Sequence, residues 1–317
     1  MRHSIYFLIV LLAGLLGLPC VQASCTTISA NSSFGNVSSF VLAGSAQIVE
    51  SGSGFTCSGS LLSLASTNTI TATVASSAHA SGNQPQLYGA ESGSYVPYSL
   101  CSDSSCASTY HSGDTITWRS TSLLGLLGLF NSSDGSLPLY LRTITGVNVP
   151  AGFYNDTITL NWKYHICFVG VLGVCVYTDG TATSTLNVSL QVSNDCYLDS
   201  APDVNFGSAA LPGQFSTISN SLSVRCTRNA TYTINLSGVN PVRNEWRQMA
   251  GVSGGKKHFL QYKINKNDGS AWGPDNDLTV VGSGSSQTIP YSANINPEQT
   301  GQPSGVYSET VTVTIGY

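Results

Sequence analysis

Short segments in which apolar and polar residues alternate recur along the whole chain. Examples are TITATVAS (69–76), STLNVSLQVS (184–193), YTINLSG (232–238) and TVTVTI (310–315), all rich in Val, Ile and Thr. Alternation with a period of two predicts strands with one buried face, and the Gly, Pro and Asn residues between the segments predict turns. After the first 23 residues, no stretch keeps a helical period for three turns. The pattern therefore predicts an all-β fold of antiparallel β-sandwiches.

The N-terminal segment has a different pattern. Arg2 and His3 precede a continuous apolar run over residues 5–18, and small residues follow up to Ala23. This order is typical of a secretory signal peptide, which we place at residues 1–23. The run is shorter than the roughly 20 apolar residues that a transmembrane helix needs, so we expect an exported chain and not an anchored one.

Two stretches of the chain share the same order of landmarks: a cysteine, a Phe-Gly pair, a second cysteine, a tryptophan and a closing segment. They lie at Cys25, 34–35, Cys57, Trp118 and 151–164 in the first stretch, and at Cys196, 206–207, Cys226, Trp272 and 304–317 in the second. A repeat of this length predicts two homologous domains. We place an N-terminal domain at residues 24–194 and a C-terminal domain at residues 195–317.

Eight cysteines remain after cleavage behind Ala23. An even set in an exported chain predicts disulfides, although eight thiols can pair in about 105 ways and the sequence alone does not choose among them. The equivalent positions in the two copies suggest one bridge in each, and leave two local pairs. The suggested pairs are Cys25–Cys57, Cys196–Cys226, Cys101–Cys106 and Cys167–Cys175.

The composition excludes several classes of partner. Only 9% of the residues are charged, and the formal net charge is -4. Lys256 and Lys257 are the only adjacent basic residues, so the chain has no basic patch for nucleic acid or anionic lipid. We therefore expect no nucleic-acid partner.

Motifs that could carry chemistry are weak. GVSGG (251–255) fits the Gly-x-Ser-x-Gly pattern, but that motif acts at a strand-to-helix turn of an α/β sheet. His111 near Cys101 and Cys106, or His165 near Cys167, could be imagined as metal ligands, yet thiols of exported chains oxidise to disulfides. We expect no enzyme activity, no metal and no cofactor.

The landmarks resemble a known family. The early cysteine with Phe-Gly after it, the central tryptophan, and the closing Gly-x-Tyr-x-(Asp/Glu)-Thr-(Ile/Val)-Thr that ends in Tyr164 or Tyr317 resemble the spore coat protein U domain. That domain occurs in subunits of archaic, Csu-type chaperone–usher pili, and its two-copy layout resembles the tip adhesin. The resemblance implies an exported, non-enzymatic pilus subunit at the cell surface, built from two tandem immunoglobulin-like β-sandwich domains with incomplete folds. It also implies that a periplasmic chaperone holds the subunit and an outer-membrane usher assembles it.

The two copies differ in a way that fits a tip subunit. After Tyr164 the first copy continues with residues 184–193, where Leu186, Val188 and the next alternate residues can form a last strand, whereas the second copy stops at Tyr317. We therefore expect the C-terminal domain to lack one edge strand and to accept a donor strand from the adjacent pilus subunit. The donor in such pili precedes the first domain cysteine, and here only Ser24 precedes Cys25, so this subunit is expected to end the fibre.

A tip needs a contact surface, and three apolar segments of the N-terminal domain are candidates. They are LLGLLGLF (123–130), whose two glycines and broken alternation disfavour a strand, the loop closed by Cys167 and Cys175, and SLLSLAS (60–66), for which core and surface are evenly matched. The candidate residues are Leu123, Leu124, Leu126, Leu127, Leu129 and Phe130, then Phe168, Val169, Val171, Leu172 and Val174, and finally Leu61, Leu62 and Leu64. A buried strand or hairpin is the alternative for the first two.

Exposed apolar loops at one end of a domain predict adhesion to hydrophobic abiotic or host surfaces, and biofilm formation. The alternative function is a carbohydrate-binding lectin, which needs aromatic and polar side chains around a pocket. Tyr88, Tyr95, Tyr98 and Tyr110 form the only candidate cluster for it.

Overall fold

The computed structural model describes residues 24–58, 62–63, 67–120, 129–171 and 174–317. The predicted signal peptide lies outside these residues. The described chain is almost entirely β, as the alternating pattern predicted, with one six-residue α-helix and one short 3-10 helix. None of its helices has the length and hydropathy to cross a bilayer.

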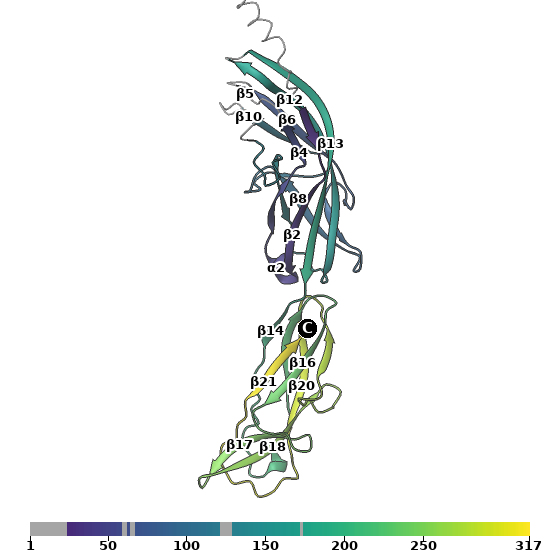
Figure 1. The fold of residues 1–317 in the computed structure, drawn as a ribbon. Coiled ribbons are helices and arrows are strands. Elements are labelled where there is room, and N and C mark those ends of the chain that lie inside the picture. Colours follow the sequence, from purple (N-terminus) through teal and green to yellow (C-terminus); the bar gives the residue numbers. More distant parts are fainter. Residues whose placement is uncertain (1–23, 59–61, 64–66, 121–128, 172–173) are drawn as a thin grey trace, which may run out of the picture.

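The molecule is elongated, with two lobes stacked end to end (Figure 1). The upper lobe in that view holds β1 (Ser24–Thr27), β2 (Ala30–Ser38), α2 (Ser39–Gly44), β3 (Ile48–Gly52), β4 (Phe55–Ser58), β5 (Leu62–Ser63), β6 (Asn68–Ser77), β7 (Gln86–Gly89), β8 (Ser94–Cys101), β9 (Thr109–Tyr110), β10 (Thr115–Ser120), β11 (Pro138–Thr143), β12 (Gly152–Val171) and β13 (Val174–Ser193). The lower lobe holds β14 (Cys196–Ser200), η2 (Pro212–Gln214), β15 (Ile218–Cys226), β16 (Thr231–Gly238), β17 (Arg247–Ser253), β18 (Lys256–Lys266), β19 (Leu278–Val281), β20 (Ser286–Ile295) and β21 (Val311–Gly316).

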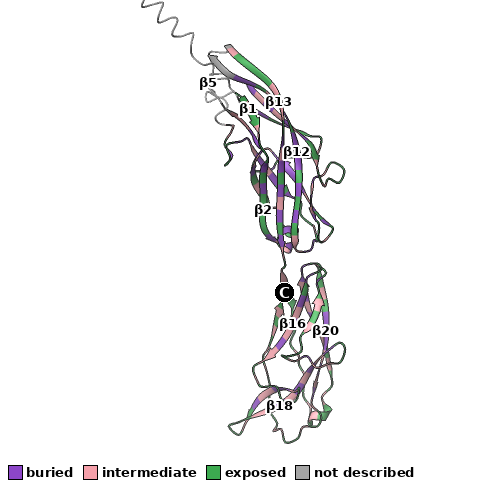
Figure 2. Ribbon diagram, turned by 45° about the vertical axis from the view of Figure 1, so that its right-hand side comes forward, coloured by how far each residue is buried: buried purple, intermediate pink, exposed green. Residues whose placement is uncertain are grey.

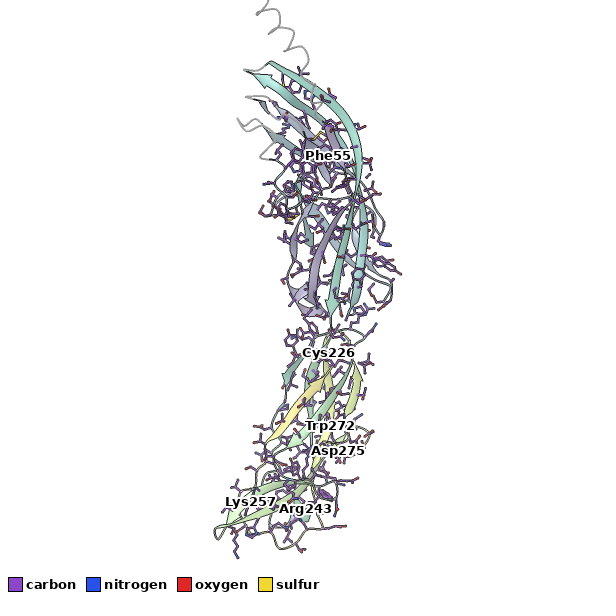
Figure 3. All side chains as sticks on the ribbon, in the orientation of Figure 1. Phe55, Cys226, Arg243, Lys257, Trp272 and Asp275 are labelled. Carbon is purple, nitrogen blue, oxygen red and sulfur yellow. A yellow bond between two sulfur atoms is a disulfide. The ribbon has the colours of Figure 1, made fainter. Side chains whose placement is uncertain are left out.

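Strand pairing stays within each lobe. Strands β1 to β13 pair only among themselves, and so do β14 to β21, so the division falls between Ser193 and Cys196. Each lobe has its own cluster of buried apolar side chains, which includes Phe55 in the upper lobe and Trp272 in the lower one (Figure 3). We call residues 24–194 the N-terminal domain and residues 195–317 the C-terminal domain.

The N-terminal domain is organised around its last strand. β13 pairs antiparallel with β12 on one side and parallel with β2 on the other. Its inward residues Leu186, Val188, Leu190 and Val192 are fully buried, and the outward ones between them are at least partly exposed. Figure 2 shows this alternation of buried and exposed positions along β12 and β13. The domain therefore completes its own core with a strand that is inserted between its first long strand and its closing strand.

The C-terminal domain packs a five-stranded sheet against a three-stranded one. The first has the order β14–β15–β20–β18–β17 and the second the order β19–β16–β21. The closing strand β21 pairs with β16 alone and lies at an edge of its sheet among the described strands. The segment 201–209, which matches β2 in the repeat, forms no strand.

The four disulfides join Cys25 to Cys57, Cys101 to Cys106, Cys167 to Cys175, and Cys196 to Cys226. These are the four predicted pairs: two from the equivalent positions of the two copies and the two local pairs that were left. The first and last occupy matching places, since each joins the first strand of its domain to the neighbouring strand in direct register.

The acidic residue of the closing segment has the same role in both copies. In the N-terminal domain, Asp156 accepts hydrogen bonds from the hydroxyls of Tyr98 at 2.7 Å and Ser77 at 2.6 Å, and Phe34 packs edge-on against Tyr98. In the C-terminal domain, Glu309 accepts one from Tyr262 at 2.6 Å, and Phe206 packs edge-on against Tyr262. Burial, reinforced by the carboxylate, raises the pKa of both tyrosines. The landmarks of the repeat are thus a packing unit that joins the Phe-Gly segment, a central strand and the closing strand.

We expect Asp156→Ala to destabilise the N-terminal domain by about 3 kcal/mol, because a 2% exposed carboxylate with three donors is removed and buried hydroxyls lose their acceptor. Thermal unfolding measures the change. Asp179→Ala is the matched control, since Asp179 is exposed and its side chain bonds, among the residues that the structure describes, only to the exposed His165. Equal melting temperatures for the two variants would contradict the role given to Asp156.

The two domains touch through a polar and aromatic junction. The Ser39 and Thr227 hydroxyls form a buried hydrogen bond at 2.7 Å. Next to it, the Arg225 guanidinium lies 5.1 Å from the ring centre of Phe40 and 5.2 Å from that of Tyr197, and the two rings meet edge-on. Helix α2 carries Ser39 and Phe40. A second contact comes from Asn148, whose side-chain amide donates to the Ser283 carbonyl at 3.1 Å and whose backbone carbonyl accepts from Arg228 at 3.1 Å.

Candidate functional site

A groove opens in the C-terminal domain where the N-terminal domain has its last strand. It encloses about 590 Å³ and is lined by the segment 201–208 on one side and by residues of β21 on the other. Its floor consists of core side chains from the strands between, among them Leu236, Leu260 and Tyr262. The groove is therefore a long opening onto the hydrophobic core.

Comparison of the two closing strands shows what the groove lacks. Residues of the two copies correspond at an offset of 153, so Val311, Val313 and Ile315 match Ile158, Leu160 and Trp162. The three N-terminal residues are fully buried, whereas the three C-terminal residues are only half-buried. In the N-terminal domain, β13 lies beside the closing strand and its core-facing residues are fully buried. In the C-terminal domain, no strand lies there among the described residues, and the matching residues of β21 remain partly exposed.

The backbone of this groove is also unsatisfied. In the N-terminal domain, the ladder groups of β2 and the outer edge of β12 pair with β13. In the C-terminal domain, the matching segment 201–209 has no strand partner among the described residues, and β21 pairs on one side only. An open edge above an apolar groove is the arrangement that accepts an extended peptide as an added strand.

The second candidate site is the end of the N-terminal domain that lies farthest from the C-terminal domain. β5, β10 and the hairpin end of β12 and β13 gather there (Figure 1). Leu62 of β5 pairs in parallel with Val169 of β12, so the structure places two of the three predicted apolar segments side by side. The third segment follows directly after β10.

The structure places the predicted contact residues unevenly. Leu129 and Phe130 are half-buried and pack on the core, and the Phe130 ring stacks at 6.4 Å on Phe55. Because burial of their apolar side chains against this core is favourable, Leu129 and Phe130 anchor the end of the LLGLLGLF segment to the domain. Phe168, Val169, Val171 and Val174 lie in the β12–β13 hairpin, whose backbone alone is described at those positions. Leu61, Leu64, Leu123, Leu124, Leu126, Leu127 and Leu172 lie outside the described residues.

Two residues that were not predicted from the sequence are exposed on the same hairpin. Val176 is 71% exposed, and Tyr177 is exposed with its ring stacked at 4.2 Å on His165. His165 in turn contacts Asp179 at 2.7 Å. The signal was available, since both residues continue the apolar run past Cys175.

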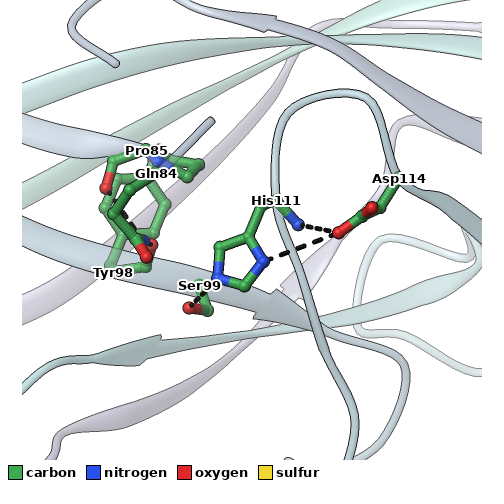
Figure 4. Close-up of polar contacts among 6 residues, drawn as sticks. All are labelled: Gln84, Pro85, Tyr98, Ser99, His111 and Asp114. Atoms are coloured by element: carbon green, nitrogen blue, oxygen red, sulfur yellow. Dashed lines mark hydrogen bonds and ion pairs between the residues drawn. The ribbon is translucent and has the colours of Figure 1, made fainter. Parts of the chain in front are cut away.

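The motifs that the sequence analysis considered weak candidates for catalysis or metal binding have structural roles. GVSGG forms the end of the β17–β18 hairpin, where Gly254 and Gly255 take positive φ and Ser253 pairs with Lys256. It is not the strand-to-helix turn that a nucleophile elbow requires. Figure 4 shows His111 between Ser99 and Asp114, with its backbone N–H donating to the Asp114 carboxylate at 2.8 Å. Its supposed metal partners Cys101 and Cys106 form a disulfide with each other.

The tyrosine cluster of the lectin alternative is only partly assembled. Tyr98 is buried against Asp156, and Tyr110 packs against the core. Tyr88 and Tyr95 pair across β7 and β8 with their ring centres 5.0 Å apart, and they remain accessible.

Comparison with known proteins agrees with the repeat. The family model of the Spore Coat Protein U domain matches residues 13–161 and again residues 182–314. Among solved structures, the chain is similar to the chaperone–tip adhesion subunit pre-assembly complex of the archaic chaperone–usher Csu pili of Acinetobacter baumannii, at 25% identity and a TM-score of 0.59 over 93% of this chain and 100% of that one. A tip adhesin of Pseudomonas aeruginosa matches at 14% identity and a TM-score of 0.35, over 93% of this chain and 94% of that one. No curated protein sequence matches the chain.

Proposed function

Since the chain belongs to the Spore Coat Protein U domain family, whose model it matches twice, we propose that it is the tip subunit of a chaperone–usher pilus. The N-terminal domain makes the surface contact, and the C-terminal domain joins the fibre by accepting a donor strand. One observation carries the proposal: the groove beside β21 has the position that β13 fills in the self-complete copy.

The N-terminal domain supplies a template for the donor strand. β13 runs antiparallel to β12 and parallel to β2, so a donor in the same geometry runs antiparallel to β21 and parallel to residues 201–209. In the template, Leu190 lies opposite Tyr154 and Leu186 opposite Ile158. At the offset of 153, the donor places aliphatic side chains opposite Tyr307 and Val311, with small or aliphatic ones between them at alternate positions.

Before assembly, the open groove needs a temporary partner. Its half-exposed apolar residues and unpaired backbone would otherwise promote aggregation. A periplasmic chaperone fits this need, and the similar Acinetobacter baumannii structure is a chaperone–adhesin complex. Exchange of that chaperone for the donor strand of the adjacent subunit at an outer-membrane usher places this protein at the cell surface.

The contact surface in this proposal is the far end of the N-terminal domain. Apolar residues are concentrated in the three predicted segments, of which Leu62 and Val169 pair at that end, and Val176 and Tyr177 add exposed area. At about 25 cal/mol per Å² of apolar area, a few hundred Å² of contact gives several kcal/mol per tip. Many pili acting together make attachment to a hydrophobic surface persistent and support biofilm formation.

Immunogold microscopy tests the position of the subunit in the fibre. Antibody against the N-terminal domain is applied to cells that assemble the pilus, with antibody against a shaft subunit as the control. We expect gold from the first antibody at fibre ends alone and gold from the second along the shaft. Gold from the first antibody along the fibre would contradict a tip location.

A further inference from the structure

A row of outward side chains runs across five paired strands of the N-terminal domain, at a distance from the apolar end. Direct pairing joins Ser33 of β2 to Ser189 of β13, Ser189 to Asn155 of β12, Asn155 to Tyr88 of β7, and Tyr88 to Tyr95 of β8. Residues directly opposite each other on paired strands share one face of a sheet. The row spans five strands, or about 19 Å at about 4.8 Å per strand.

The row borders a shallow hollow of about 420 Å³. Phe153, Thr157, Asn31 and Asn187 line it together with Asn155 and the two serines of the row. Phe153 is 55% exposed and Tyr95 is 46% exposed. We call the outward side chains of this row and hollow the lateral face. Its composition is Asn, Ser, Thr, Tyr and Phe.

The polar groups of the lateral face are of two kinds. Asn187 is fixed, because its amide donates to Asn31 at 3.1 Å and accepts from Thr157 at 3.2 Å. By contrast, the Asn155 amide and the hydroxyls of Tyr88 and Tyr95 make no hydrogen bond with other described residues. They stand in one row with their hydrogen-bonding capacity open to a ligand.

The two tyrosines of the lateral face contact a third ring, that of His79. The His79 ring lies 5.0 Å from that of Tyr88, and the His79 backbone N–H donates to Asp156 at 3.1 Å. Tyr88 in turn packs on Tyr95. The carboxylate of Asp156, although its residue borders the hollow, is turned into the core toward Tyr98. The rings are thus positioned, and the outward side chains that line the hollow carry no formal charge.

This chemistry selects one class of ligand. A nucleic acid or another polyanion needs Lys or Arg, which the lateral face lacks. A hydrophobic protein surface would leave the open amide and hydroxyls without partners, at a cost for each. A neutral sugar chain fits both the aromatic and the polar groups of the lateral face. The C–H faces of its rings pack on Tyr and Phe, while its hydroxyls bond to amide and hydroxyl groups.

We propose that the lateral face of the N-terminal domain binds a neutral oligosaccharide chain, laid across β2, β13, β12, β7 and β8. This site is separate from the apolar end, because Asn155 and Cys167 are twelve residues apart on β12, about 40 Å along the strand at about 3.3 Å per residue. The tip would then have two contacts of different chemistry, one for apolar surfaces and one for polysaccharide.

Saturation-transfer NMR on the full chain, purified with its chaperone, tests the proposal. The probes are the neutral hexasaccharides of cellulose, mannan and chitin, with hyaluronan and heparin oligosaccharides as charged comparisons. We expect at least one neutral probe to bind, and Tyr88→Ala with Tyr95→Ala to weaken it at least tenfold. Asn155→Ala should weaken it severalfold, while Ile48→Ser, at an exposed position of β3, leaves it unchanged.

Adhesion to plastic separates this site from the proposed function, since the tyrosine double variant should adhere like the original chain. The proposal is overturned if no neutral probe binds, if only the charged probes bind, or if the double variant binds with unchanged affinity and an unchanged melting temperature. Loss of probe binding together with a lowered melting temperature would also overturn it, because Tyr88 and Tyr95 would then be structural.

Discussion

A copy of residues 184–193 fused behind Tyr317 through a flexible linker of about six residues should stabilise the C-terminal domain strongly. The added strand can place four aliphatic side chains in the groove, each worth about 1.5–3 kcal/mol on burial, against the entropy of ordering it. A net gain of about 3–5 kcal/mol corresponds to about 12–20 °C for a domain of this size. Calorimetry of the full chain, without chaperone, should show the lower transition move upward by that amount, and aggregation should decrease.

The control carries the same linker and segment with the residues copied from Leu186, Val188, Leu190 and Val192 replaced by Ser. It can form the backbone ladder but cannot fill the apolar groove, so it should give a small fraction of the gain. If the unfused chain is monomeric and melts as high as the fused one, the groove needs no partner. A fused strand that stabilises equally well with serines would show that side-chain burial is not the source of the gain.

Replacement of Leu126, Leu127, Phe168, Val171 and Leu172 by Ser or Thr should remove at least nine-tenths of the binding to plastic. Exposed apolar side chains can become polar at little cost, whereas a core position made polar costs several kcal/mol. The melting temperature of the N-terminal domain should therefore stay the same and pili should still assemble. Adhesion of piliated cells to polystyrene, read beside thermal unfolding, measures both.

Phe130→Ser provides the contrast, because its ring packs on Phe55 and the core. Phe130→Ser should clearly lower the melting temperature of the N-terminal domain, whereas the five-residue variant should leave it unchanged. A large fall in stability for the five-residue variant would assign those residues to the core. Unchanged adhesion with unchanged stability would remove the apolar end as the adhesive site.

The sequence predicted what depends on local alternation and on the repeat. β6, β16 and β21 lie within a residue or two of the alternating segments, and the comparison of copies indicated where the groove lies. It could not predict that Leu129 and Phe130 are half-buried, because a continuous apolar run does not say which residues meet the core. The lateral face was hidden for a related reason. Ser33, Tyr88 and Asn155 are far apart in sequence and meet only through strand register.

Helix α2 and the junction were also missed. Ser39–Gly44 is too short to show a helical period, and the contact of Phe40 with Arg225 joins residues of different domains. The structure gives the reason for this helix: it places Ser39 against Thr227 and Phe40 against Tyr197 and Arg225 of the other domain.

The two-sided pairing of β13 determines how the molecule carries a mechanical load. β13 begins at the hairpin of the apolar end and finishes at Ser193, just before the chain enters the C-terminal domain. If the protein is the proposed tip subunit, a pull between an attached surface and the fibre acts along this strand. Ladder hydrogen bonds run across the strands, so the pull shears many of them at once against β12 and β2 and does not open them one at a time. Beyond the junction, the load reaches β14, which the Cys196–Cys226 disulfide fastens covalently to β15. The path of force from surface to fibre thus follows one continuous strand and then a covalent crosslink.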